Sequence, residues 1–124
     1  MTIAASHTAL NVCALTQLTP ELGAAILAGD EQIALFRLAD DRIFAVQNWD
    51  PFSGACVLSR GITGSRGDEP TIASPIFKQV FSLVTGACLV TMDKQPVAGA
   101  SAHLVTYPVS VDNGRVILHL AAAA

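Results

Sequence analysis

The three cysteines and three histidines are the first candidates for metal binding or nucleophilic chemistry. Cys13, Cys56 and Cys88 are widely spaced, no pair of them forms a C-x-x-C motif, and no histidine stands at zinc-finger spacing from them. An odd cysteine count also argues against a disulfide scaffold. A catalytic histidine needs an orienting partner, which the sequence does not provide for His103 or His119. We therefore expect small buried cysteines and structural or solvated histidines.

A glycine-rich stretch over residues 61–67 is the next candidate, as a cradle for phosphate. It lacks the Lys-Ser/Thr ending of a phosphate loop and a following helix, so no helix N-terminus points at an anion. The composition favours a plain flexible loop. Arg60 and Arg66 still offer guanidinium groups that suit bidentate pairing with an anion or with a partner's carboxylate.

Composition limits the classes of function. The chain has 124 residues, of which 52% are hydrophobic and 14% charged, with a net charge of −3. This length gives one domain, and this hydrophobicity excludes a disordered chain. The absence of a basic stripe disfavours nucleic-acid binding, which requires clustered Lys and Arg. So few charges on a small surface suggest that a partner covers part of it.

Neither a membrane span nor an export signal is visible in the sequence. The apolar stretches are far shorter than the ~20 residues that cross a bilayer. The first basic residue is Arg37, so the charged start of a signal peptide is missing. We expect a cytoplasmic protein without membrane contact.

The elements that must position any site are strands. Apolar runs at residues 33–38 and 43–46 flank a polar turn and predict a hairpin with both faces buried, and residues 80–83 and 88–90 predict another. A longer strand over residues 104–111 is interrupted by Pro108, which indicates an edge or a bulge.

Turn and cap residues complete the prediction. Asn113-Gly114 predicts a tight hairpin between residues 104–111 and 115–120. Thr19-Pro20-Glu21 has the form of a helix start and predicts a helix of about one or two turns. The centre of the chain, residues 47–79, is rich in glycine and proline and is expected to be a long irregular insert.

The order of segments resembles the Rieske family. The hairpin at residues 33–46 is followed by NWDPFSG at 48–54 and by ASPIFKQVFSLVTG at 73–86. The family has Asn-x-Cys-Pro-His-x-Gly in the first place and Cys-Pro-x-His before Phe-x-Leu-x-Thr-Gly in the second. The resemblance implies an all-β, Rieske iron–sulfur-protein-like fold of antiparallel strands with a loop-rich central insert. It implies one domain over residues 12–120, with a flexible N-terminus (1–11) and a short tail (121–124).

The family's cluster ligands are replaced in this chain. Asp50 and Phe52 stand where the first loop has Cys and His, and Ser74 and Phe77 stand at the equivalent positions of the second. A Rieske [2Fe–2S] centre needs two thiolates and two imidazoles. Phe cannot coordinate, and Ser is a poor substitute for a soft thiolate. The resemblance therefore implies a domain with no cluster, no other cofactor and no catalytic residue of its own.

A longer resemblance extends to the small subunits of assimilatory NAD(P)H-dependent nitrite reductases. Residues 48–53, 59–62 and 73–75 match segments of that family in order, while Ser82 and the Ala-rich residues 92–104 depart from it. The resemblance implies an accessory subunit for nitrate assimilation. Its partner would be the large subunit, which carries FAD, an iron–sulfur cluster and sirohaem and reduces nitrite to ammonia.

Aromatic and arginine side chains gather in the central segment, which is the usual composition of an interface hot spot. We expect Phe52 and Phe77 to fill the space that the cluster would occupy. Trp49, Arg60 and Arg66 are then the candidates for contact with the large subunit. Two alternatives stay open: a stand-alone, cluster-free Rieske-like module for binding or regulation, and a Rieske electron carrier with altered ligands. The latter predicts visible absorbance and acid-labile sulfide.

Overall fold

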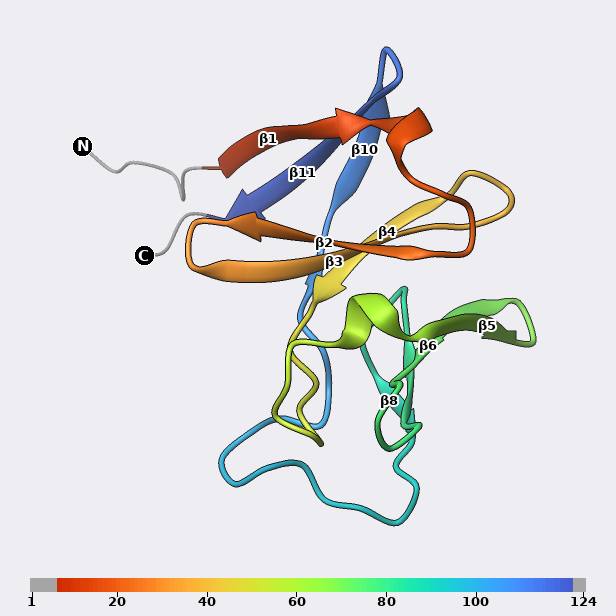
Figure 1. Ribbon diagram of the computed structural model, residues 1–124, viewed down its shortest axis with the longest axis vertical. Helices are drawn as coiled ribbons and strands as arrows, with labels where there is room; N and C mark the ends of the chain where they lie inside the picture. Colours follow the sequence, from red (N-terminus) through yellow and green to blue (C-terminus); the bar gives the residue numbers. More distant parts are fainter. Residues whose placement is uncertain (1–6, 122–124) are drawn as a thin grey trace.

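The computed structural model describes residues 7–121, which form three antiparallel sheets (Figure 1). The first sheet has the order β1-β11-β10, with β1 at His7–Ala14, β10 at Val109–Asp112 and β11 at Arg115–Ala121. The hairpin predicted from Asn113-Gly114 is confirmed, and both turn residues adopt the positive φ angles, 50° and 74°, that such a turn requires. Residues 7–11 belong to β1, so this part of the expected flexible N-terminus is a strand paired with β11.

The second sheet has the order β2-β3-β4-β9. Its strands are β2 (Gly23–Ala28), β3 (Glu31–Arg37), β4 (Ile43–Gln47) and β9 (Thr106–Tyr107). The predicted hairpin of residues 33–38 with 43–46 is confirmed as β3 and β4. The strand expected over residues 104–111 is divided at Pro108: β9 pairs with β4 and β10 with β11, so the chain changes sheet at the proline.

The helix expected from Thr19 is wrong. A 3₁₀ turn, η1 (Leu15–Gln17), precedes it, and β2 begins at Gly23. Glu21 has φ 66°, which no α-helix allows, and its backbone N–H donates to the carbonyl oxygen of Arg37 at 2.6 Å. Its carboxylate accepts from the backbone N–H of Ala39 and from the Thr63 hydroxyl. These contacts with distant segments outweigh the local helix signal.

The third sheet has the order β5-β6-β7-β8, and its first two strands lie within the central segment. Its strands are β5 (Ile62–Arg66), β6 (Glu69–Ala73), β7 (Val80–Ser82) and β8 (Cys88–Val90). β7 and β8 confirm the second predicted hairpin. The flexible loop expected over residues 61–67 is instead strand β5, reached through a second 3₁₀ turn, η2 (Leu58–Arg60). Its side chains are mostly exposed, so no apolar alternation marked it in the sequence.

Two hydrophobic cores lie on the two faces of β3. Ala34 and Phe36 belong to a core shared with the third sheet, and Ile33 and Leu35 belong to a core shared with the first. All four side chains are fully buried, which confirms that both faces of this hairpin are covered. β3 is therefore the central strand of the domain. Within residues 7–121, no helix is long and apolar enough to cross a membrane.

Candidate functional site

Two loops come together at the end of the domain opposite β1 and β11. The first, residues 48–56, follows β4, and the second, residues 74–79, connects β6 to β7 (Figure 1). These are the two segments that carry the Rieske resemblance. Because each loop leaves a strand whose side chains are buried, the sheets fix where the loops meet.

Asn48 anchors the first loop to the second sheet. Its side-chain amide donates to the Gln32 side-chain oxygen at 3.3 Å and to the Cys56 carbonyl oxygen at 3.2 Å, and its Oδ1 accepts from the Ser59 N–H at 2.7 Å. The side chain is buried, so these bonds take the place of water. One amide therefore fixes both ends of the loop against β3.

Asp50 joins the two loops. Its Oδ1 accepts from the Phe52 N–H at 2.9 Å, and its Oδ2 accepts from the Ser53 hydroxyl at 2.9 Å and the Ser74 hydroxyl at 2.6 Å. Asp50 and Ser74 are both buried. The bonds to Phe52 and Ser53 shape a tight turn in the first loop, and the Asp50–Ser74 bond connects this turn to the second loop. Both carboxylate oxygens are engaged by the protein itself.

The two phenylalanines have different surroundings. Phe52 is buried in the core with Phe81, with the ring centroids 6.0 Å apart and the rings tilted by 52°. This is the filling role expected for it. Phe77 is 38% exposed, so the expectation that it fills the same space is wrong. The Lys94 ammonium lies 4.5 Å from the centre of its ring and forms a cation–π contact with it.

A third loop, residues 91–105, packs beside the other two. The N–H of Val97 donates to the Pro51 carbonyl oxygen at 2.8 Å, and the Gln79 amide donates to the Thr91 carbonyl oxygen at 3.3 Å. Gln79 is fully buried, and its Oε1 is the one buried side-chain polar atom without a hydrogen-bond partner within the described residues. The third loop is therefore hydrogen-bonded to both of the other loops.

Cys88 is influenced by this site, because the Asp50 carboxylate affects the pKa of its thiol. Burial raises the pKa of its thiol, a backbone hydrogen bond with Val90 opposes this, and the Asp50 carboxylate adds to the increase. The thiol donates weakly to the Val90 carbonyl oxygen at 3.5 Å. A thiol with a raised pKa is a poor nucleophile and a poor metal ligand at neutral pH. Cys88 is half-buried and Cys56 exposed, so the expectation of buried cysteines is wrong for Cys56.

The donor set does not fit a [2Fe–2S] cluster. Asp50 and Ser74 are bonded to each other, Phe52 is part of the core, and Phe77 has no donor atom. Such a cluster needs two thiolates and two imidazoles. Across residues 7–121, no group of three or more His, Cys, Asp or Glu side chains is placed to hold a metal ion. The polar side chains of this site hydrogen-bond to one another and to the backbone of the first loop.

The three interface candidates lie on different elements. Trp49 is half-buried in the first loop, and its indole N–H donates to the Gly54 carbonyl oxygen at 3.0 Å. Arg60 ends η2 and Arg66 ends β5. Both arginines are exposed, and neither forms an ion pair within the part of the chain that the structure describes. Their guanidinium groups are thus available to a partner.

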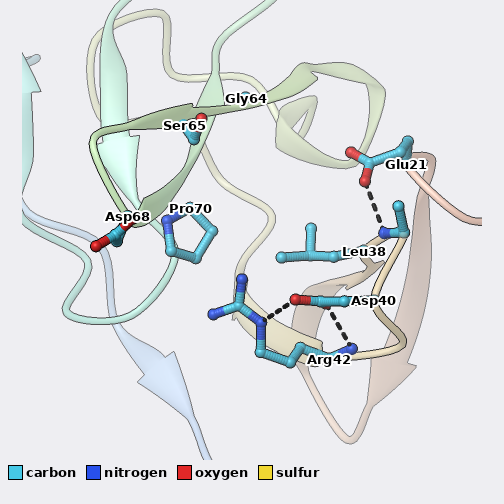
Figure 2. Close-up of a pocket in the computed structure, with 9 residues that line it drawn as sticks. Glu21, Leu38, Asp40, Arg42, Gly64, Ser65, Asp68 and Pro70 are labelled. Carbon is cyan, nitrogen blue, oxygen red and sulfur yellow. Dashed lines mark hydrogen bonds and ion pairs between the residues drawn. The ribbon is translucent and has the colours of Figure 1, made fainter.

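A hollow of about 320 Å³ lies between the turn after β3 and the β5–β6 hairpin (Figure 2). Asp40 forms an ion pair with Arg42 at 2.8 Å, and the Glu21 carboxylate accepts from the Ala39 N–H at 2.7 Å. The backbone N–H of Arg42, with its guanidinium, holds the pKa of Asp40 below its ordinary value. No histidine or cysteine lines the hollow. The charged groups around the hollow hold the turn after β3 in place and include no catalytic pair.

Sequence reasoning placed the loops and their degenerate positions but missed the bonds between them. The sequence marks Asp50 and Ser74 only as replaced ligands, and no motif marks Asn48 or Gln79. The available signal was the pair itself: a carboxylate and a hydroxyl at positions where two ligands would face each other. Lys94 carried no signal, because its contact with Phe77 depends on the path of the third loop.

Comparison with known proteins identifies this arrangement. Residues 9–119 match the family model of the Rieske-like [2Fe-2S] domain. The chain is 42% identical over 80 residues to the nitrite reductase (NADH) small subunit of Escherichia coli K12, covering 64% of this chain and 74% of that protein. It is also 36% identical over 105 residues to the nitrite reductase [NAD(P)H] large subunit of Klebsiella oxytoca, covering 85% of this chain but only 10% of the large subunit.

Solved structures agree with the sequence comparison. The crystal structure of an NADH-dependent nitrite reductase small subunit from Mycobacterium tuberculosis superposes with a TM-score of 0.81 at 41% identity, covering 95% of this chain and 99% of that one. The ferredoxin of carbazole 1,9a-dioxygenase from Nocardioides aromaticivorans has a TM-score of 0.73 at 22% identity, covering 94% and 99% of the two chains. The second likeness concerns the fold alone and confirms the predicted all-β architecture.

Proposed function

The chain belongs to the Rieske-like [2Fe-2S] domain family, among the nitrite reductase small subunits, and we propose that it is the accessory subunit that binds the large subunit of NAD(P)H nitrite reductase. The observation that carries this proposal is the likeness to the Mycobacterium tuberculosis small subunit over nearly the whole of both chains. The match to a tenth of the Klebsiella oxytoca large subunit supports the partner, because there a related segment is part of the large subunit's own chain.

The domain's contribution is structural rather than redox. At the former ligand positions, Asp50 and Ser74 hydrogen-bond to each other and Phe52 packs against Phe81. These side chains neither bind a cluster nor transfer electrons. The reduction of nitrite to ammonia with NAD(P)H would then take place wholly in the large subunit, with the FAD, iron–sulfur cluster and sirohaem that the resemblance implies. The complex would serve nitrate assimilation in the cytoplasm.

The central segment supplies one contact with that partner in this proposal. Arg60 and Arg66 are exposed, with no ion pair among residues 7–121, and their guanidinium groups suit carboxylates of the large subunit. Trp49 is held in place by its bond to Gly54, so it would lose little conformational freedom on binding. Aromatic and arginine side chains of this kind dominate the binding energy of many interfaces.

The test adds the purified domain to the large subunit and follows nitrite-dependent NAD(P)H oxidation together with ammonia yield. We expect a saturable rise in rate and direct binding. Arg60→Glu and Trp49→Ala should weaken binding while leaving the fold intact, and Arg60→Lys, which keeps the charge, should weaken it less. Absence of both binding and activation would contradict the proposal and favour a stand-alone module. Visible absorbance with acid-labile sulfide in the purified domain would favour the electron carrier.

A further inference from the structure

The end of the domain that carries the first and last strands has its own surface features. His7 at the start of β1 pairs with Ala121 at the end of β11, so the two ends of the described chain lie side by side. The turn between β2 and β3 lies at the same side of the molecule, on the left in Figure 1, away from the site loops and from the β5–β6 hairpin. This end is therefore separate from the surface considered so far.

A groove of about 410 Å³ runs between β1 and β2 at this end. It is lined by Leu10, Val12, Ile26, Leu27 and Ala28, together with the polar side chain of Asn11. Leu27 is 73% exposed, more than any other large hydrophobic side chain that is exposed in the described chain. β1 and β2 are each the outermost strand of their sheet, so the groove lies between two sheet edges. An exposed apolar patch at such a place is typical of a contact surface.

A second hollow, of about 280 Å³, lies on the other side of the β2–β3 turn and carries a negative charge. Val105, Pro108 and Leu120 form apolar walls, the His119 ring also lines the hollow, and the Glu31 carboxylate lies 3.5 Å from the Tyr107 hydroxyl. Among residues 7–121, neither hollow is lined by a Lys or Arg side chain. Apolar walls that lead to a carboxylate fit the aliphatic stem and the charged head of a basic side chain.

Resting on the proposed function, we propose that this end of the domain is a second contact surface for the nitrite reductase large subunit. The large subunit would place an apolar side chain against Leu27 in the groove and a Lys or Arg against Glu31 in the adjoining hollow. Both hollows are bordered by the terminal strands: Leu10 and Val12 belong to β1, and Leu120 belongs to β11.

The relation to the large subunit supports this choice of occupant. In Klebsiella oxytoca the related segment is covalently part of the large subunit's chain. A polypeptide that continues from β1 or β11 leaves the domain beside the groove or beside the Glu31 hollow. The rest of the large subunit is thus tethered nearest to this end. A tether raises the effective concentration of the large-subunit surface that lies beside it. The separate small subunit would use the same surface without the tether.

The experiment measures the affinity of the purified domain for the purified large subunit by biolayer interferometry at low and at moderate salt. We expect Leu27→Glu to weaken binding at least about tenfold and Glu31→Lys about fivefold, with Glu31→Gln between Glu31→Lys and the wild type. The affinity of the wild type should fall with salt, and that of Glu31→Gln should fall less. Val111→Glu is the matched control: Val111 is a 44% exposed strand residue on β10 and lines neither hollow, so its affinity should stay within about twofold.

The outcomes separate this inference from the function on which it rests. If the wild-type domain does not bind the large subunit, the proposed function and this surface both fail. If the wild type binds and Leu27→Glu and Glu31→Lys bind equally well, the function stands and this surface is excluded. A loss seen equally with Val111→Glu would also overturn the assignment, since it would not be specific to this end. Circular dichroism of each variant confirms that the change in affinity is not a change in fold.

Discussion

The Ser74 hydroxyl donates a 2.6 Å hydrogen bond to Oδ2 of Asp50 and so connects two loops whose residues are 24 positions apart in the chain. In the Rieske family the equivalent positions hold cluster ligands, and the metal connects the loops. Here a buried pair of side chains makes the connection. The domain can therefore keep the Rieske arrangement of its loops without depending on iron for its stability.

Ser74→Ala should destabilise the domain by about 1–3 kcal/mol, because it removes the bond and leaves Oδ2 of buried Asp50 one donor short. Urea denaturation followed by tryptophan fluorescence measures the change, with Trp49 in the first loop as the reporter. Ser53→Ala is the control. Ser53 donates to the same oxygen at 2.9 Å but from within the first loop, so its loss should cost less. Equal losses in the free energy of unfolding would show that the bond between the loops stabilises the domain no more than a bond within one loop.

Phe52→Ala should cost about 3–5 kcal/mol in the free energy of unfolding, because it opens a cavity beside Phe81 in the core. Phe77→Ala should cost about 1 kcal/mol or less, since that ring is partly exposed and loses mainly its contact with Lys94. Denaturation curves of the two variants give the comparison. A larger loss for Phe77 would mean that its ring is buried in solution.

The three cysteines should react in a fixed order with a thiol reagent. Cys56 is exposed and should be alkylated first. Burial raises the pKa of both Cys13 and Cys88, so at pH 8 less of each is thiolate, the reactive form. Raising the pH should accelerate the slow phase as these thiols ionise. Mass spectrometry after timed iodoacetamide treatment locates each adduct, and Cys56→Ser should abolish the fast phase. Rapid labelling of Cys88 in that variant would contradict the assignment.

Gly86 and Gly67 both have positive φ, at 80° and 60°, but differ in the space around them. A Cβ on Gly86 would lie 2.1 Å from the Leu104 carbonyl oxygen, whereas one on Gly67 would meet nothing within 4 Å. Gly86→Ala should therefore cost more than about 3 kcal/mol, and Gly67→Ala about 1 kcal/mol. Thermal unfolding of the two variants tests the difference. A mild Gly86→Ala phenotype would show that the third loop can move away from β8.

Much of the fold was predictable from local signals. The Asn113-Gly114 turn and the apolar runs around residues 39–42 specify their hairpins through turn chemistry and burial, which are properties of neighbouring residues. The helix expected at Thr19 failed because Glu21 bonds to Arg37, Ala39 and Thr63, none of which is local. β5 was missed for a different reason: as an exposed strand it carries no apolar alternation for its pairing with β6 to be recognised.

The candidate site was predictable in position and not in geometry. The resemblance located Asp50, Phe52, Ser74 and Phe77, but residue types alone could not show that two of them bond to each other. The contact of Phe77 with Lys94 depends on the path of the third loop, which no motif specifies. The groove beside Leu27 could not be predicted from the sequence either. It forms between the edges of two sheets, which come together only in the folded chain.

The pairing of β1 with β11 has a consequence for how the chain is made. β1 is synthesised before every other strand of the described domain, yet within the described residues its only sheet partner is β11, the last of these strands to be synthesised. The β2–β3–β4 hairpins need only local contacts and can form during translation. The nascent chain thus carries the apolar side chains of β1 without their partners until β11 emerges. Over that interval, binding by a chaperone or by the large subunit itself would protect the unfinished subunit from aggregation.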